Sequence, residues 1–277
     1  MKNVLIKIQR EIAAIEEACA LGDKTFKYIL TKIKQDISEI ELAFEIKSFI
    51  KSNGANISFP PIVGFGANSA FPHHKPTDQR LKSNDQIMLD LGVKLNNYCS
   101  DMTRTVFFGK PTREQKRMYQ TVLDAQQKAT EYLYSVVSSN FVARDPKGIS
   151  RSARNDNRVR QIKASEVDKA ARSYITSQGY PTIPHSLGHG IGTKVHEAPR
   201  LSLKSKDILK PGMVFTIEPG IYIPEGSNCD PKWWNIGVRI EDDILITETE
   251  SVILSVKAPR EIVDIEQLMK EVGGFEK

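Results

Sequence analysis

The segment IMLDLGV (residues 87–93) constrains the fold most, because an apolar run typical of a buried strand contains a carboxylate, Asp90. Removing a carboxylate from water is costly unless the group is paired or binds a metal ion. A second aspartate, Asp101, follows eleven residues later in the segment CSDMTRT. The fold must therefore bring a positive charge or a metal ion into the interior beside this strand.

Three further candidate ligands stand in strand-like or glycine-rich segments later in the chain. His189 lies in HSLGHGIG, Glu218 in VFTIEPG and Glu241 in GVRIEDD. With the two aspartates they make one imidazole and four carboxylates, a set that suits Mn, Fe or Co better than a metal that prefers thiolates. Four carboxylates carry charge for two divalent ions, which can share and activate one hydroxide at a separation of about 3.5–4 Å.

The order of periodic segments predicts the fold class. Helices are expected over residues 3–34, 38–52, 112–137 and 165–178, and strands within residues 59–108, 213–223 and 235–247. The first helical stretch is expected to break into two helices at residues 21–23 because of Gly22, and capping boxes mark the helix starts near Ser38 and Thr112. Helices, strands, helices and strands in this order predict an α+β domain of two related halves.

The composition is that of an ordinary globular protein, with 40% hydrophobic and 26% charged residues in a chain of 277. No apolar run approaches the roughly 18 residues that span a bilayer, and the first residues lack the apolar core of a signal peptide. The cysteines form no CxxC pair, so Cys19, Cys99 and Cys229 are expected to be buried thiols in a reducing compartment, the cytoplasm.

The net charge of +5 is concentrated in one segment. Residues 144–163 contain seven basic and two acidic residues, a surplus equal to the net charge of the whole chain. The wider polar segment 138–163 is predicted to be an exposed inserted loop, since charge runs are usually solvated. A nucleic-acid partner is not favoured, because it requires basic residues spread along one surface.

Several segments together carry a resemblance to a known family. GANSAFPHHKPT, LDLGVKLNNYCSDMTRT, HSLGHGIGTKVHEAP, FTIEPGIYI and GVRIEDD are similar to motifs of the pita-bread metallopeptidases, in their aminopeptidase P and prolidase branch. The similarity runs from about residue 8 to residue 256. It implies two pseudo-twofold related halves around a curved antiparallel sheet. We expect one catalytic domain, residues 1–277. This is a departure from the family, whose members usually carry a separate amino-terminal domain, and the chain is either naturally short or a fragment.

The resemblance implies two divalent metal ions, for which we expect Mn ahead of Co, Fe or Zn. Their ligands would be Asp90, Asp101, His189, Glu218 and Glu241. Asp101 and Glu241 would bridge the ions, and Glu218 would also transfer a proton from the nucleophile to the leaving nitrogen.

The other candidate residues also take their roles from the resemblance. His73 would contact the scissile region, and His196 would stabilise charge on the carbonyl oxygen. His185 would hold the substrate, and Arg239 would contact the substrate or, as we prefer, clamp the ligating carboxylates. His74 has no counterpart in the family and is expected to be a surface residue.

The function implied is that of a metal-dependent exopeptidase. The main expectation is an Xaa-Pro aminopeptidase, which hydrolyses the first peptide bond before a proline by attack of a metal-bridging hydroxide. Its partner would be a peptide with a free amino terminus, with no membrane involved and a homodimer left open. The alternatives are an Xaa-Pro dipeptidase, a methionine aminopeptidase and a pita-bread binding module without catalysis.

Overall fold

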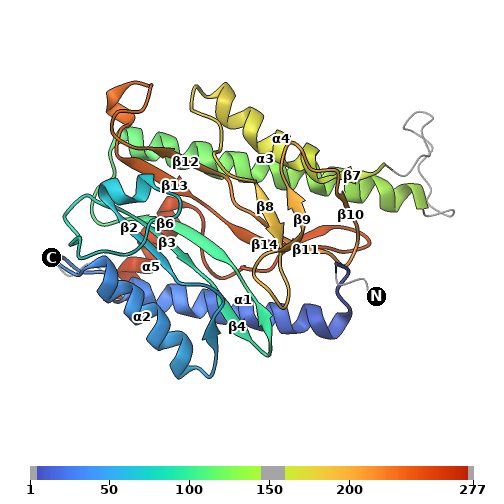
Figure 1. Cartoon of the computed structure of the whole chain (residues 1–277), viewed down its shortest axis with the longest axis horizontal. Helices are drawn as coiled ribbons and strands as arrows, with labels where there is room; N and C mark the ends of the chain where they lie inside the picture. Colours follow the sequence, from blue (N-terminus) through green and yellow to red (C-terminus); the bar gives the residue numbers. More distant parts are fainter. Residues whose placement is uncertain (1–4, 145–159, 274–277) are drawn as a thin grey trace.

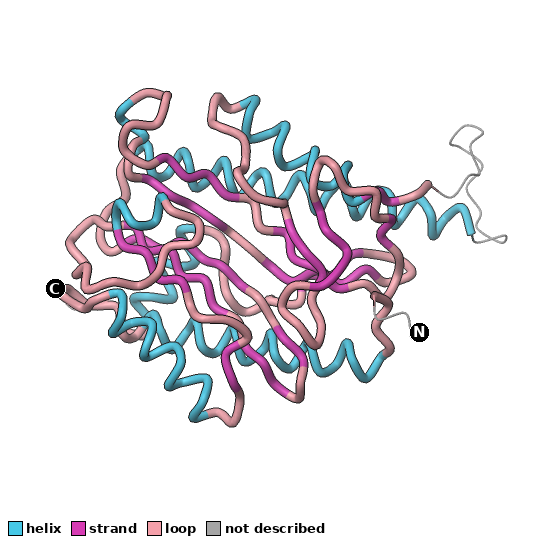
Figure 2. The backbone as a smooth tube through the Cα atoms, viewed as in Figure 1, coloured by secondary structure: helices cyan, strands magenta, loops and turns pink. Residues whose placement is uncertain are grey.

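The computed structural model describes residues 5–144 and 160–273. Its helices are α1 (Gln9–Leu30), α2 (Glu39–Ser52), α3 (Arg113–Arg144), α4 (Ala164–Ser177) and α5 (Ile262–Glu271). Figure 1 shows α1 and α2 along one side of the molecule and α3 and α4 along the other, with strands between them. Figure 2 shows the same arrangement, with the strands in magenta between two sets of cyan helices.

The first half of the chain builds the sheet that contains Asp90. Strand β3 (Gln86–Leu91) pairs antiparallel with β2 (Ile62–Phe65) on one side and β6 (Met102–Phe107) on the other. A smaller sheet has the order β1 (Asn56–Ile57), β4 (Val93–Leu95) and β5 (Tyr98–Cys99). All six residues of β3 are buried, so the predicted buried strand is confirmed and Asp90 lies in the interior.

The second half repeats the pattern of two helices followed by antiparallel strands. Its five-stranded sheet has the order β15 (Ser251–Ile253), β14 (Asp242–Ile246), β11 (Val214–Ile217), β8 (Gly188–Gly190) and β9 (Glu197–Leu201). Strand β12 (Gly220–Ile223) pairs with β13 (Ile236–Arg239), and β7 (Ile162–Lys163) pairs with β10 (Ile208–Leu209). Two short 3₁₀ helices complete the elements, η1 (Gly66–Ala70) and η2 (Pro231–Trp233).

The α+β class predicted from the sequence is confirmed. A single buried apolar cluster includes residues of both halves, such as Ile29 of α1, Leu89 of β3, Val122 of α3 and Phe215 of β11. Both capping boxes are present, since Ser38 and Glu41 exchange hydrogen bonds at the start of α2 and Thr112 and Gln115 do so before α3. The sheets therefore rest on helices whose start points are encoded locally.

The expected break of the first helix at residues 21–23 is wrong, because α1 runs through them. A glycine inside a helix costs only about 1 kcal/mol relative to alanine. Tertiary contacts offset that cost: Thr25 is fully buried, and the Asp23 carboxylate accepts the backbone N–H groups of Lys257 and Ala258.

The predicted loop 138–163 is wrong at both ends. Helix α3 continues to Arg144, and residues 162–163 form β7. Buried Asn140 explains how the helix stays attached beyond its expected end, since its side chain bonds both the N–H and the carbonyl of Arg160, at 2.7 and 2.8 Å. The middle of the segment, residues 145–159, lies outside the described residues.

Two properties expected from composition can be compared with the structure. Over the residues described here, no helix combines the length and apolar character needed to cross a bilayer. All three cysteines are free thiols; Cys19 and Cys99 are buried as expected, whereas Cys229 is only half-buried.

Candidate metal centre

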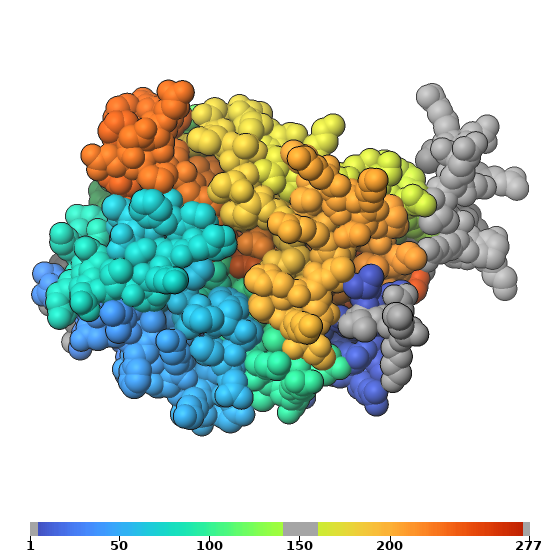
Figure 3. All heavy atoms as spheres, in the orientation of Figure 1, coloured from blue at the N-terminus to red at the C-terminus, as the bar shows by residue number. Residues whose placement is uncertain are grey.

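The sheets bring all nine predicted site residues to one cavity of about 530 Å³. Figure 3 shows a hollow on the viewed face, between the cyan segment and the segments coloured yellow to orange. Its walls include the five expected ligands and the four other candidates, which are Asp90, Asp101, His189, Glu218, Glu241, His73, His185, His196 and Arg239. Residues separated by more than 160 positions in the sequence thus share one space.

Each expected ligand is placed by a strand or a strand end. Asp90 lies within β3 opposite Thr103 of β6, and Asp101 directly precedes β6. His189 is the middle residue of β8, Glu218 follows β11, and Glu241 stands between β13 and β14. The antiparallel pairing of β11 with both β8 and β14 brings the last three ligands to one end of the second sheet.

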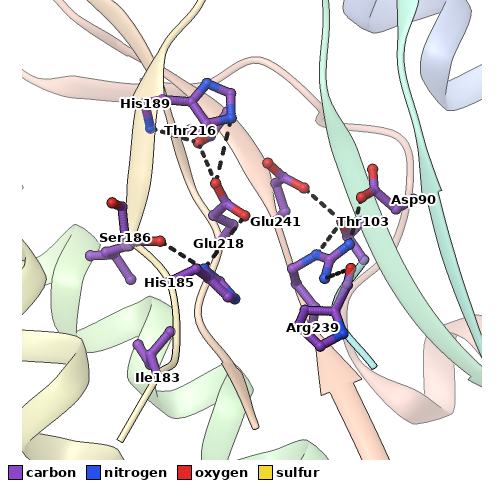
Figure 4. A network of polar contacts seen from close by, with 12 residues as sticks. Asp90, Thr103, Ile183, His185, Ser186, His189, Thr216, Glu218, Arg239 and Glu241 are labelled. Carbon is purple, nitrogen blue, oxygen red and sulfur yellow. Dashed lines mark hydrogen bonds and ion pairs between the residues drawn. The ribbon is translucent and has the colours of Figure 1, made fainter. Parts of the chain in front are cut away.

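The arrangement fits divalent cations. Asp101, His189 and Glu241 each offer a ligand atom, and these atoms all lie within 4.8 Å of one another. His189 Nε2 lies 3.6 Å from Asp101 Oδ2. It also lies 3.5 Å from Glu218 Oε1, and Figure 4 draws this contact. The Oδ1 atoms of Asp90 and Asp101 are buried without any hydrogen-bond partner among the described residues. Buried carboxylate oxygens without a hydrogen-bond partner are suitable ligands for a hard cation.

Electrostatics give the same indication. Burial, followed by repulsion from Glu241, raises the pKa of Asp101 well above its usual value, and burial raises the pKa of Glu218 to about 8. Burial lowers the pKa of His189 to about 4, so this imidazole is neutral near pH 7 and its lone pair is available to a metal. A bound cation would reverse the carboxylate shifts and stabilise the ionised forms.

Arg239 and Thr103 hold the carboxylates of the first and second halves together. Arg239 donates to Asp90 Oδ2 at 2.5 Å and, through Nε, to the hydroxyl of Thr103 at 2.9 Å. Thr103 in turn donates to Glu241 Oε2 at 2.6 Å, and Figure 4 shows this chain of bonds beside the ligands. Arg239 therefore bonds one expected ligand directly and a second one through Thr103.

Tyr222 is a residue of this site that the sequence did not single out. Its hydroxyl accepts a hydrogen bond from Arg239 at 2.8 Å and lies 3.0 Å from His185 Nε2. The Nδ1 atom of His185 lies 2.8 Å from the Ser186 carbonyl, which can only accept, so Nδ1 carries the proton. In the neutral ring Nε2 is then the acceptor, and Tyr222 donates to it. The alternation of side chains along a strand predicts that Tyr222 lies on the same face of β12 as Gly220. It does not predict the contact with His185, which comes from a distant segment.

The two adjacent histidines are placed differently. His73 is exposed and lines the cavity. The expectation that His74 is a surface residue is wrong, because its side chain is only 12% exposed and its Nε2 atom lies 2.8 Å from the fully buried carboxylate of Glu39. A buried acceptor on α2 draws this imidazole inward, and no local sequence pattern signals such a partner.

A carboxylate behind the ligands was also missed. Asp243 Oδ2 accepts the backbone N–H of Asp101 at 2.9 Å and the thiol of Cys19 at 3.2 Å. Burial raises the pKa of Asp243 to about 7. This contact connects α1 to the backbone of a ligand.

The sequence of this chain is similar to those of known peptidases. The sequence profile of metallopeptidase family M24 matches residues 13–143 and 149–248. An uncharacterized peptidase, YqhT, of Bacillus subtilis is 40% identical over 261 residues, and an Xaa-Pro dipeptidase of Pyrococcus horikoshii is 39% identical over 261 residues. Each match covers 94% of this chain and 64% of the relative, so the chain spans slightly less than two thirds of their length.

A solved structure extends the likeness to three dimensions. The crystal structure of an X-Pro aminopeptidase from Thermotoga maritima superposes with a TM-score of 0.78 at 32% identity, over 93% of this chain and 64% of that one. The pita-bread fold expected from the sequence is confirmed by such neighbours.

Proposed function

The chain belongs to metallopeptidase family M24, and on that premise we propose that it is an Xaa-Pro dipeptidase, which splits a dipeptide whose second residue is proline. The observation that carries the proposal is the cavity. Its lining includes Asp90 and Asp101, whose buried Oδ1 atoms have no hydrogen-bond partner among the described residues, and a second arginine, Arg200. Because the curated relatives are longer than this chain, their activity is a proposal here.

Arg200 supports the dipeptide over longer substrates. It lines the cavity and is exposed, and its Nε donates to the hydroxyl of Ser186 at 2.6 Å. Arg239, in contrast, is buried against Asp90. A dipeptide differs from a longer peptide by the free carboxylate on its second residue, and an accessible guanidinium is well suited to bind it. We therefore assign Arg200 to the substrate carboxylate.

The metal centre would be held by Asp90, Asp101, His189, Glu218 and Glu241, with Mn as the proposed ion. When bound, divalent cations activate a water nucleophile near neutral pH and polarise the scissile carbonyl. The proposal is supported by Asp101, His189 and Glu241, each of which offers a ligand atom within 4.8 Å of the others.

The protein's own residues would then perform the proton transfers. Glu218, whose carboxylate lies beside the rings of His185 and His189, would accept a proton from the attacking water in its ionised form and return it to the proline nitrogen. His196, whose ring centroid lies 4.4 Å from that of His189, would donate to the developing oxyanion, and His73, which also lines the cavity, would contact the scissile bond. Asp90 would receive the substrate amino group.

The Xaa-Pro aminopeptidase reading expected from the sequence is the second candidate. The Thermotoga maritima structure favours it, whereas the Xaa-Pro dipeptidase relative of higher identity favours the dipeptidase. Activity of the Mn-loaded protein on Ala-Pro and Met-Pro, compared with Ala-Pro-Ala and Met-Pro-Ala, separates the two. Preference for the dipeptides supports our proposal, and preference for the tripeptides replaces it with the aminopeptidase.

An arginine variant tests the assignment of the carboxylate. In Arg200→Gln we expect KM for Ala-Pro to rise about tenfold, the loss of one charge-assisted contact, with little change for Ala-Pro-Ala. Lys204→Gln is the matched control, because it removes one exposed positive charge from the adjacent loop. An equal effect of Arg200→Gln on both substrates would remove Arg200 from this role.

The location of the protein in the cell and its oligomeric state are also proposed. We place the protein in the cytoplasm, because its three cysteines are free and two of them are buried thiols. The homodimer stays a prediction that sedimentation of the purified chain would test.

A further inference from the structure

Glu39 stands at the centre of a buried cluster outside the metal centre. It is the first residue of α2, and its carboxylate is fully buried. Oε1 accepts from the Phe65 N–H at 2.8 Å and the Asn68 side-chain amide at 2.9 Å. Oε2 accepts from the N–H and hydroxyl of Thr77 at 2.9 and 2.8 Å, and pairs with His74 Nε2 at 2.8 Å. We call these five residues the Glu39 cluster.

The chemistry of this cluster fixes the role of His74. A carboxylate can only accept hydrogen bonds, so His74 Nε2 carries a proton and donates. The position of Glu39 in the first turn of α2 also favours a negative charge. His74 supplies one of five donors, and it is the one that stands next to His73 in the sequence.

The cluster secures both ends of the segment that carries His73. Phe65 and Asn68 lie before His73 in the chain, and Thr77 lies after it. His73 makes no side-chain hydrogen bond to any described residue, so its place on the cavity wall depends on its backbone. The carbonyl of the preceding residue, Pro72, accepts from Arg239 at 3.2 Å. The segment therefore contacts the clamp on Asp90 as well.

We propose that His74, through Glu39, is a positioning residue for His73, and this rests on the function proposed above. His74 does not line the cavity, so it would not contact a substrate or a metal bound there. It holds the backbone on which His73 stands, so its loss lets the His73 imidazole move relative to the scissile bond. A displacement of about 1 Å near reacting atoms can cost up to about a hundredfold in rate.

The first test compares three single variants in the Mn-loaded protein. We expect His74→Ala to lower kcat for Ala-Pro about tenfold with KM within about twofold, within the range for a displaced catalytic group. His74→Gln keeps a donor near the position of Nε2 and should restore kcat to within about threefold. Lys75→Ala, an exposed neighbour on the same segment, is the control. If His74→Ala behaves like Lys75→Ala, the proposal is wrong.

The second test asks whether His74 acts through His73. In a double-mutant cycle, His74→Ala should lower kcat less than about twofold once His73 is already alanine, because coupled residues are not additive. An unchanged tenfold effect in that background would show a general structural role and overturn the proposal.

Hydrogen exchange separates this inference from the proposed function. In His74→Ala the amides of Phe65 and Thr77, which donate to Glu39, should exchange faster than in the wild type. If the wild type cleaves no Xaa-Pro peptide, the proposed function fails, and exchange still decides whether His74 holds the segment. Unchanged exchange at both amides would contradict the inference even in an active enzyme.

Discussion

The buried carboxylate of Glu39 and those of the candidate metal centre differ in whether their oxygens have hydrogen-bond partners. Glu39 accepts five hydrogen bonds from the Glu39 cluster, so its buried charge is fully satisfied. In the metal centre, Asp90 and Asp101 each keep a buried oxygen without a partner among the described residues. The contrast teaches that burial alone does not mark a ligand. The distinguishing property is an unsatisfied acceptor that faces other potential ligands.

The largest expected effect on activity comes from a substitution of Asp101, one of the carboxylates with an unpartnered oxygen. Asp101→Asn should abolish tightly bound Mn and lower kcat/KM about ten-thousandfold, because the metals supply several kcal/mol of transition-state stabilisation. The metal-free variant should be at least as stable as the metal-free wild type, because repulsion between Asp101 and Glu241 is removed. Metal analysis, peptide assays and urea unfolding measure these results, with exposed Asp78→Asn as the control. Full activity without metal would contradict the site.

The satisfied group should respond in the opposite way. Glu39→Ala leaves five donors without their acceptor, and we expect it to lower the free energy of unfolding by about 3 kcal/mol. Urea unfolding measures the loss against Lys47→Ala, an exposed change on the same helix that should have a small effect. Should Glu39→Ala cost no more than Lys47→Ala, the contrast between the two groups would fail.

Without metal, the stability of the protein should depend on pH because of the carboxylates in the candidate metal centre. The pKa of Glu218 is raised to about 8 by burial, so between pH 6.5 and 8 the folded metal-free protein holds a proton that the unfolded chain has released. Its stability should therefore fall by about 1–2 kcal/mol as pH rises across this window. His185 and His189, whose pKa values are lowered to about 4, oppose the trend by about 0.4 kcal/mol each, because their unfolded rings are still half protonated at pH 6.5. Asp243, whose pKa burial raises to about 7, loses its proton in the same window and offsets this opposition.

Urea unfolding in EDTA at pH 6.5 and 8 measures this change. Added Mn should abolish the loss at pH 8, because metal binding competes with protons and strengthens as they leave. A metal-free protein that gains stability between these two pH values would contradict the assigned burial of Glu218.

The smallest expected effect on activity concerns the hydrogen bond between Tyr222 and the neutral ring of His185. Tyr222→Phe removes the donor to His185 Nε2 and an acceptor of Arg239, and should lower kcat/KM about threefold to tenfold. ¹⁵N NMR of the histidine rings should show a Nδ1–H tautomer for His185 in the wild type and a mixed tautomer in the variant. Exposed Tyr134→Phe is the control. A Nε2–H tautomer in the wild type would refute the assignment.

Sequence reasoning found what depends on local pattern. Asp90 was recognisable because its apolar neighbours predicted a buried strand, and β3 is indeed buried throughout. Capping boxes at Ser38 and Thr112 were equally visible, since their partners lie three residues away. The resemblance to a family added His73, His185 and His196, all of which line the cavity.

The missed features depend on contacts between distant segments. Thr103 reaches Glu241 because these two distant segments meet in the fold, where the Glu241 N–H donates to the Thr103 carbonyl at 3.1 Å. The inward position of the His74 side chain could not be predicted because its partner, Glu39, lies 35 residues earlier in the chain. The helix break expected at Gly22 failed for the same reason, because distant residues such as Lys257 compensate for the glycine.

The division of the ligands between the two halves has a consequence for how the protein matures. Asp90 and Asp101 come from the first half, and His189, Glu218 and Glu241 come from the second. Neither half alone contains all five expected ligands, so high-affinity metal binding at this site would have to follow the association of the two halves during folding. A metal ion bound last would then slow the separation of the halves, and the lifetime of the folded protein would depend on metal supply.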